Sequence, residues 1–126
     1  KDFYSTNNQQ LYLMSAYRSY NDQATLFEWG CSLNRCARLW ASEHQLWLAV
    51  DIHLATKNWY NILWGEYLER LNQNAHKYWF INTYRKWAKI DGKMAEVWHR
   101  RYVWKYLATE LFEKDLSFAE YYALSL

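Results

Sequence analysis

The feature of this sequence that most restricts its fold is a shortage of residues that form tight turns. Its 126 residues include no proline and only three glycines. Short β-hairpin turns depend on Gly and on Asn-Gly or Asp-Gly pairs, whereas Pro and Gly are disfavoured inside helices. Strict alternation of apolar and polar residues, the pattern of a half-buried strand, is also hard to find. We therefore expect an all-α fold.

Apolar residues spaced three and four positions apart support this prediction, because that spacing places them on one face of a helix. Three series follow it: Leu26, Trp29, Leu33, Cys36 and Trp40; Phe80, Tyr84, Trp87 and Asp91; and Met94, Val97, Arg101, Trp104, Ala108 and Leu111. We expect each series to face the core of a helical bundle.

Capping residues predict where the helices begin and end. A first helix would begin at Ser5 or Thr6 and end near Tyr20, and a second would run from Asn21 or Asp22 to about Ala41.

Further boundaries come from local motifs. Ser42 with Gln45, and Ser117 with Glu120, match the capping-box pattern. Residues Asn72–Asn74 predict a turn with Asn74 capping the next helix. Asp91–Gly92 predicts the end of that helix, with Gly92 in the left-handed conformation.

The stretch 43–71 leaves two alternatives open. It is one long helix, or two helices with a break near Lys57–Asn58, where the apolar spacing falls out of phase. We expect a single helical domain over residues 1–126, folded as a compact bundle of five to six helices. The alternatives are a four-helix-like bundle with one long helix and a short α-solenoid. The stretches "LWGEYLERL" and "KIDGKMAEVW" resemble parts of tetratricopeptide-type repeats, which implies stacked helical hairpins.

The composition predicts an artificial origin. Nine Trp and 12 Tyr accompany the absence of Pro, and hydrophobic residues make up 52% of the chain. Large aromatics fill the space between helices, so the chain resembles a de novo designed helical protein in style. We expect a folding or scaffold protein with no natural biochemical activity.

No apolar run approaches the ~20 residues of a membrane span, and the N-terminal residues lack the pattern of a signal peptide. We expect a soluble chain with no membrane partner, compatible with a reducing cytosol. Cys31 and Cys36 would lie on different faces of the predicted helix, so we expect two reduced thiols.

Motifs for catalysis or metal binding are incomplete. The histidines at 44, 53, 76 and 99 form no HxxxH pair. Glu96 and His99 form one Glu-x-x-His element, but a di-iron bundle needs two copies. Gly30, Gly65 and Gly92 are isolated, so no phosphate-binding loop is present. We predict no catalytic, cofactor-binding or metal-binding residues and no enzymatic activity.

One segment, "KYWFINTYRKWAK", resembles the recognition helix of homeodomains. The residues that match are Lys77, Trp79, Phe80, Asn82, Lys86, Trp87 and Lys89. The resemblance implies that Asn82 reads adenine. A helical wheel instead places Phe80, Tyr84 and Trp87 on an apolar inner face. Asn82, Arg85, Lys86 and Lys89 then face outward. We interpret the resemblance as coincidental.

Two alternative functions involve binding partners. Exposed Trp and Tyr side chains would suit self-association or a protein partner. Residues 76–105 carry eight Lys and Arg against two acidic residues, a net charge of +6 within a chain of net charge +2. This segment is a candidate nucleic-acid-binding surface, although we consider nucleic acid the less favoured partner.

Overall fold

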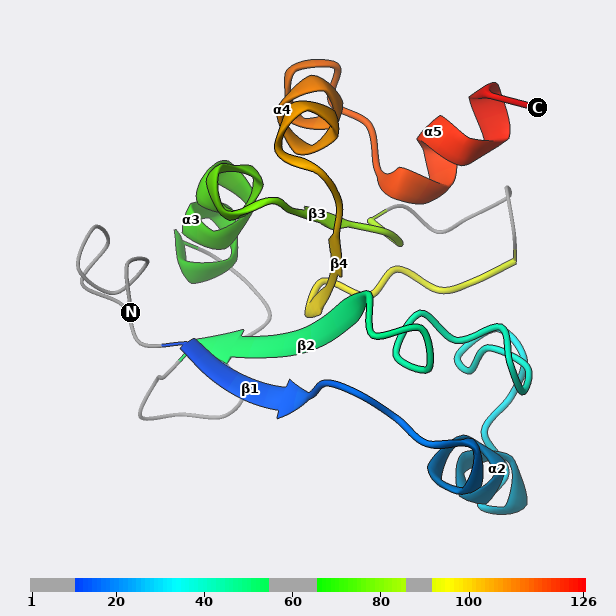
Figure 1. The fold of residues 1–126 in the computed structure, drawn as a ribbon. Helices are drawn as coiled ribbons and strands as arrows, with labels where there is room; N and C mark the ends of the chain where they lie inside the picture. The colour runs from blue at the N-terminus through cyan, green and yellow to red at the C-terminus, as the bar shows by residue number, and fades with distance from the viewer. Residues whose placement is uncertain (1–10, 55–65, 86–91) are drawn as a thin grey trace.

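A four-stranded antiparallel sheet organises the fold, in a computed structural model that describes residues 11–54, 66–85 and 92–126 (Figure 1). The strands are β1 (Leu11–Ser15), β2 (Ala49–Leu54), β3 (Phe80–Asn82) and β4 (His99–Tyr102), in the order β1-β2-β4-β3. The all-α prediction is therefore wrong.

Within the described residues, five helical segments accompany the sheet. They are α2 (Tyr20–Glu28), α3 (Glu66–Asn74), the 3₁₀ helix η2 (Ala75–Tyr78), α4 (Lys105–Glu113) and α5 (Phe118–Leu124). Figure 1 shows α3 and α4 near one another at one end of the molecule, with α2 at the opposite end. None of these described segments exceeds nine residues, so the predicted bundle of long helices is replaced by a mixed α/β fold.

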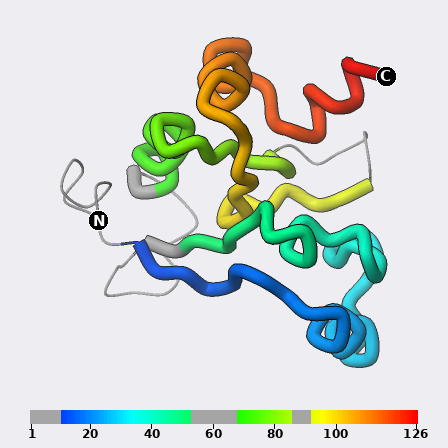
Figure 2. Tube along the Cα trace, viewed as in Figure 1, coloured from blue at the N-terminus to red at the C-terminus, as the bar shows by residue number. Residues whose placement is uncertain are grey.

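The sheet was missed because strand pairing depends on residues far apart in the chain. Asp51 in β2 lies opposite His99 in β4, and Asn82 in β3 lies opposite Arg100. The paths of β1 and β2, which are far apart in the chain, run side by side in the Cα trace (Figure 2). A chain with this many apolar residues also matches a helical spacing by chance, so periodicity alone did not separate the two structures.

Local capping signals gave mixed results. Ser117 and Glu120 form the predicted capping box at the start of α5. Ser42 and Gln45 do not begin a helix; the Gln45 backbone N–H donates to the Ser42 carbonyl in a turn, at 3.0 Å.

The second predicted helix begins earlier and ends sooner than expected. Ser19 caps α2, with Asp22 completing the capping box. The helix ends at Glu28, and Gly30 follows in the left-handed conformation (φ 83°). The prediction that this helix reaches Ala41 is wrong.

The segment 43–71 is neither one helix nor two. It contains β2, and α3 begins at Glu66 and continues through the predicted turn to Asn74. Gly92 does adopt the predicted left-handed conformation (φ 74°). The break at Lys57–Asn58 and the start of the first predicted helix lie outside the described residues. The described part of that helix is wrong, because Leu11–Ser15 form β1.

The segment that resembles a homeodomain helix is also not an α-helix in its described part. It passes from η2 through Trp79, in the left-handed conformation (φ 71°), into β3. Asn82, expected on the surface, is buried, and Tyr84 is half-buried. Lys86, Trp87 and Lys89 lie outside the described residues.

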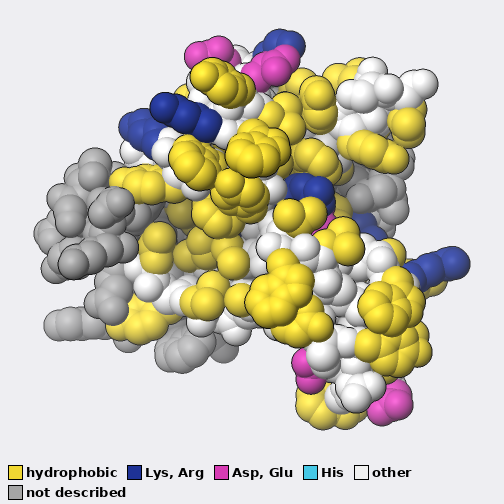
Figure 3. Space-filling model, in the orientation of Figure 1, with side chains coloured by type: hydrophobic (Ala, Val, Ile, Leu, Met, Phe, Trp, Pro, Cys, Tyr) yellow, Lys and Arg dark blue, Asp and Glu magenta, His cyan; other side chains and the backbone are white. Residues whose placement is uncertain are grey.

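A small core joins the helical end to the sheet. Leu71 of α3 and Ala75 of η2 pack with Leu11, Tyr78 and Phe80. Many aromatic side chains remain on the surface (Figure 3), among them Trp29, Trp40, Trp47 and Trp104. Within the described residues no helix has the length and apolar character needed to cross a membrane.

Candidate metal centre

The pairing of β2 with β4 brings an aspartate and a histidine together in the interior. Asp51 and His99 occupy directly opposite positions in the two strands. Their side chains point to the same face of the sheet, and the His99 Nδ1 atom lies 3.2 Å from the Asp51 Oδ1 atom.

A second histidine reaches this pair from the turn that precedes β2. The His44 Nε2 atom lies 3.3 Å from the same Asp51 oxygen. On the other side of the ring, the His44 Nδ1 atom lies 2.7 Å from the Ala16 carbonyl oxygen. The Arg18 backbone N–H donates to the His44 carbonyl at 3.2 Å, which ties the turn to residues 16–18.

The three side chains form a donor set suited to a metal ion. One nitrogen of His44, one nitrogen of His99 and one oxygen of Asp51 all lie within 4.8 Å of one another, and all three residues are buried. Catalytic zinc sites commonly use three protein ligands of the imidazole and carboxylate type, which leaves a coordination position for water or substrate. The residues present therefore fit a zinc ion.

Glu96 adds a carboxyl group beside this centre. Its Oε2 atom lies 3.8 Å from the His99 Nδ1 atom. Burial raises the pKa of Glu96 above its ordinary value, and this effect exceeds the opposing influence of nearby His99. A partly buried carboxyl group with a raised pKa is suited to taking up and returning a proton.

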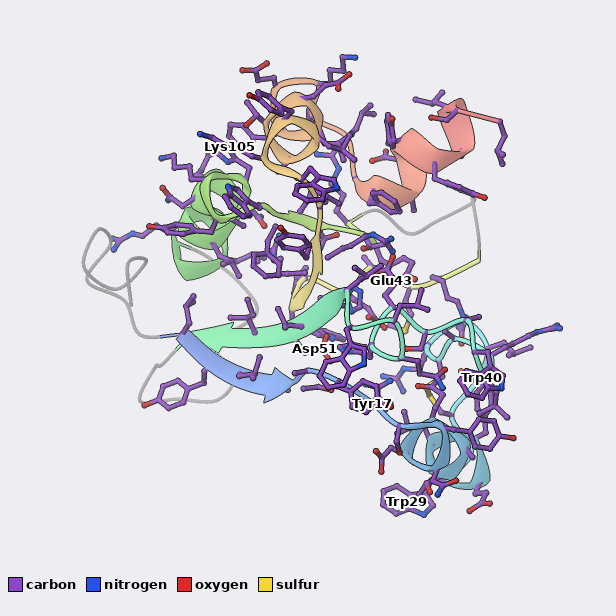
Figure 4. All side chains as sticks on the ribbon, viewed as in Figure 1. Tyr17, Trp29, Trp40, Glu43, Asp51 and Lys105 are labelled. Carbon is purple, nitrogen blue, oxygen red and sulfur yellow. A yellow bond between two sulfur atoms is a disulfide. The ribbon has the colours of Figure 1, made fainter. Side chains whose placement is uncertain are left out.

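The centre opens into a cavity of about 230 Å³. Arg18, Tyr84 and Glu96 line it together with the two histidines and Asp51. Figure 4 shows Asp51 in the first half of β2 and Glu43 in the turn that precedes this strand. The cavity thus combines a cation, a carboxyl group and a candidate metal site.

Hydrogen bonds within the centre shift the pKa values of Asp51 and His99 in opposite directions. Burial alone would raise the pKa of Asp51, but hydrogen bonds from His44 and His99 outweigh burial and lower it. Burial would lower the pKa of His99, but hydrogen bonds to Asp51 and Glu43 raise it to about 9. The carboxylate of Asp51 is therefore ionised at neutral pH.

Sequence reasoning recognised part of this constellation but not the whole. The predicted helices place the Glu96–His99 element and His44 apart, and they give Asp51 no role. His76 lies elsewhere, stacked on Phe112 with ring centroids 3.7 Å apart. The signal in the sequence was His44 seven residues before Asp51, followed much later by Glu96-x-x-His99, a spacing that only a sheet brings together.

The cysteines and the basic segment also differ from the predictions. Cys31 and Cys36 form a disulfide across a Cα–Cα distance of 6.0 Å, because the chain turns there instead of continuing as a helix.

Within 76–105, Arg100 is buried and Arg101 pairs with Glu43. Arg85 pairs with Asp115 and Glu120, so these three cations do not form an exposed basic surface.

Comparison with known proteins identifies relatives of natural origin. Residues 2–105 match the sequence model of the VanY family, described as D-alanyl-D-alanine carboxypeptidase. The YodJ protein of Bacillus subtilis (strain 168) is 34% identical over 124 residues, which cover 90% of this chain and 45% of YodJ. The chain thus spans less than half the length of this relative.

Solved structures share the fold. The LdcB LD-carboxypeptidase, from a study of peptidoglycan recognition, is 31% identical with a TM-score of 0.79, and the match covers 96% of this chain and 61% of that one. The VanY D,D-pentapeptidase E175A variant, solved with Zn(II), is 27% identical with a TM-score of 0.75, and the match covers 96% and 76% of the two chains.

These matches overturn four predictions together. The chain is not an artificial scaffold, because it has natural relatives along most of its length. An interaction module, a nucleic-acid-binding protein and a protein without enzymatic activity do not fit a family of carboxypeptidases either. The absence of Pro and the many aromatic residues are therefore features of a natural chain and not the mark of design.

Proposed function

Because the chain belongs to the VanY family of D-alanyl-D-alanine carboxypeptidases, we propose that it is a zinc-dependent carboxypeptidase that removes the terminal residue from peptides ending in D-Ala-D-Ala. The observation that carries the proposal is the buried cluster of His44, Asp51 and His99, whose ligand atoms lie within 4.8 Å of one another. The peptide part of peptidoglycan is the expected substrate class.

The metal would be held by His44 through Nε2, by His99 through Nδ1 and by Asp51 through a carboxylate oxygen. These atoms face one another, whereas the second nitrogen of each ring is engaged outside the cluster. When bound, zinc supplies Lewis-acid chemistry that polarises a carbonyl group and makes water more acidic. The zinc bound by the related VanY protein supports the choice of metal.

Glu96 would act as the proton carrier of the reaction. Hydrolysis forms a bond between a water oxygen and the scissile carbonyl carbon and breaks the bond from that carbon to the amide nitrogen. A Glu96 carboxylate oxygen takes a proton from the water and delivers it to the leaving nitrogen. The position of Glu96 supports this role, because its Oε2 atom lies 3.8 Å from the His99 Nδ1 atom, beside the proposed metal site.

Arg18 is the candidate for binding the terminal carboxylate of the substrate. It lines the cavity, and its Nη2 atom lies 4.0 Å from Asp51 Oδ2. Its Nη1 atom donates to the Gln23 side chain at 2.9 Å, and buried Gln23 in turn donates to the Ala37 carbonyl at 2.7 Å. The guanidinium is thereby held in one orientation, which suits recognition of a carboxylate.

The Cys31–Cys36 disulfide bears on where the protein acts. Disulfides persist in oxidising compartments and are rare in the cytosol of most organisms. The proposal therefore replaces the expected reducing cytosol with an oxidising environment, where cell-wall peptides are also found.

The test is release of D-alanine from a peptide ending in D-Ala-D-Ala by the zinc-loaded chain. Glu96→Gln is expected to lower the rate by a factor of about 10²–10⁴. Glu110→Gln is the matched control, since this acid lies on the exposed surface of α4 and should retain the full rate. Peptides ending in L-Lys-D-Ala provide a comparison arm for the residue that precedes the terminal D-Ala.

Absence of D-alanine release by the zinc-loaded chain, with both peptides, would overturn the proposal. An equal rate in Glu96→Gln would overturn the role given to that residue.

A further inference from the structure

Glu43 is a buried carboxylate that sits behind the metal centre, outside the set of candidate ligands. Its side chain is 10% exposed. The Oε2 atom lies 2.8 Å from His99 Nε2 and accepts a hydrogen bond from the Thr83 hydroxyl at 2.8 Å. The Oε1 atom accepts from the Arg101 guanidinium. Each carboxylate oxygen therefore has a defined partner.

The two histidines of the centre are oriented in opposite ways. His44 directs Nδ1 to a backbone carbonyl and Nε2 to the centre. His99 directs Nε2 to Glu43 and Nδ1 to the centre. A hydrogen-bond acceptor behind each ring determines which nitrogen keeps its proton and which one is left to bind a metal. For His99, that acceptor carries a negative charge.

We propose that Glu43 is a positioning residue for the metal centre: it holds the His99 proton on Nε2 and orients the ring so that Nδ1 faces the metal. The proposal rests on the proposed zinc site. A carboxylate behind a ligand histidine also makes the ring a stronger donor, because negative charge stabilises the positive charge that the ring gains on binding a cation.

Two residues keep Glu43 in this role instead of letting it turn toward the metal. Thr83 donates to the same oxygen that faces His99, and Arg101 holds the other oxygen. The Arg101 guanidinium lies over the Phe118 ring, 4.1 Å from its centroid. Phe118 belongs to α5, beyond the residues that match the family model, so this chain's C-terminal helix supports the centre from outside that region.

The experiment measures the affinity of the full chain for zinc alone, by competition with a chromophoric chelator. Glu43→Ala is expected to weaken zinc binding by about 10–100-fold. Glu43→Gln keeps a neutral acceptor for the Nε2 proton but loses the charge, so it should fall between Glu43→Ala and the unaltered chain. Glu110→Gln, an exposed acid on α4, is the matched control and should bind zinc as the unaltered chain does.

A second measurement separates positioning from general structural damage. The midpoint of urea unfolding without metal is compared for the same variants. Positioning predicts that Glu43→Gln loses zinc affinity while the metal-free variant still unfolds in one cooperative transition, with a midpoint lowered only by loss of the charge paired with Arg101. If Glu43→Ala does not fold, Glu43→Gln and Thr83→Val decide the question by the same comparison.

Zinc affinity within twofold of the unaltered chain in both Glu43 variants, or in Glu43→Gln and Thr83→Val if Glu43→Ala does not fold, would overturn the inference. Failure of the unaltered chain to bind zinc would overturn the metal site and the inference together. Zinc binding that depends on Glu43, without D-alanine release from either peptide, would support the inference while overturning the proposed reaction.

Discussion

At the scale of single residues, three tryptophans adopt the left-handed backbone conformation, which residues other than glycine rarely adopt. Trp40, Trp47 and Trp79 have φ values of 65°, 61° and 71°. Their side chains are 73%, 73% and 41% exposed, so little burial offsets the strain. The left-handed conformation costs about 1–2 kcal/mol for a residue with a Cβ atom and almost nothing for glycine.

We therefore expect Trp40→Gly to raise the free energy of unfolding by up to about 1 kcal/mol, since relief of strain exceeds the entropy that glycine adds to the unfolded chain. Urea unfolding would measure the change. Trp104→Gly is the matched control, because Trp104 is 76% exposed but has an ordinary φ of −62°. A loss of stability in Trp40→Gly equal to that of the control would contradict the strain argument.

Arg100 is a buried cation whose described contacts are all with uncharged groups. It is 2% exposed and donates to the Asn72 side chain and to the Val97 carbonyl. Burial lowers the pKa of its guanidinium to about 10. A folded-state pKa below that of the unfolded chain means that folding disfavours the charged form, so the charge destabilises the protein at pH 7.

Arg100→Met should accordingly raise the free energy of unfolding by about 1–3 kcal/mol. Arg101→Met in the neighbouring position should lower it, because Glu43 would then lose the cation that compensates its buried charge. The denaturation midpoints of the two variants test both the predicted rise and the predicted fall in the free energy of unfolding. A less stable Arg100→Met variant would show that the guanidinium contacts outweigh the burial of charge.

At the scale of elements, α5 depends on its first turn. The Ser117 hydroxyl accepts from the Glu120 backbone N–H at 3.3 Å, and the Glu120 carboxylate accepts from the Ser117 backbone N–H at 2.8 Å. The same carboxylate lies 3.2 Å from Arg85, after β3. The cap therefore both begins the helix and joins it to the segment that follows β3.

Ser117→Ala should lower the free energy of unfolding by about 1 kcal/mol through loss of the cap. Relative to the unaltered chain, hydrogen exchange in Ser117→Ala should become faster in α5 by more than it does in β2 and β4. Ser125→Ala, at the C-terminal end of the same helix, is the control and should change exchange less. Unchanged protection of α5 in Ser117→Ala would show that packing alone maintains the helix.

At the scale of the whole molecule, the candidate centre joins segments that are distant in the chain. His44 comes from a turn, Asp51 from β2 and His99 from β4. A ligand that binds the folded state alone stabilises it in proportion to the logarithm of its concentration over its dissociation constant. Zinc should therefore stabilise the fold as a unit.

At a zinc concentration 100 times its dissociation constant, the gain should be about 2.7 kcal/mol, observed as a higher melting temperature that a chelator reverses. Asp51→Asn should abolish most of this gain, since it removes an anionic ligand. Glu110→Gln should keep it. An equal shift in Asp51→Asn would place the metal elsewhere.

The features that could be predicted from the sequence are those that depend on neighbouring residues in the chain. The Ser117–Glu120 cap and the left-handed Gly92 were both recognised, because a few consecutive residues determine each of them. The expected aromatic contact surface for a protein partner stays a prediction. The Glu96–His99 element was recognised as well, but a predicted helix did not bring it next to His44 and Asp51.

Only the tertiary structure decided the fold class and the site. Asp51 and His99 are neighbours because β2 pairs with β4 in one particular register, and a slip of one residue would turn one of them to the opposite face. That register depends on contacts between residues far apart in sequence, whose free energy no local pattern contains. The sequence by itself determined which donors exist; pairing of the strands determined that they meet.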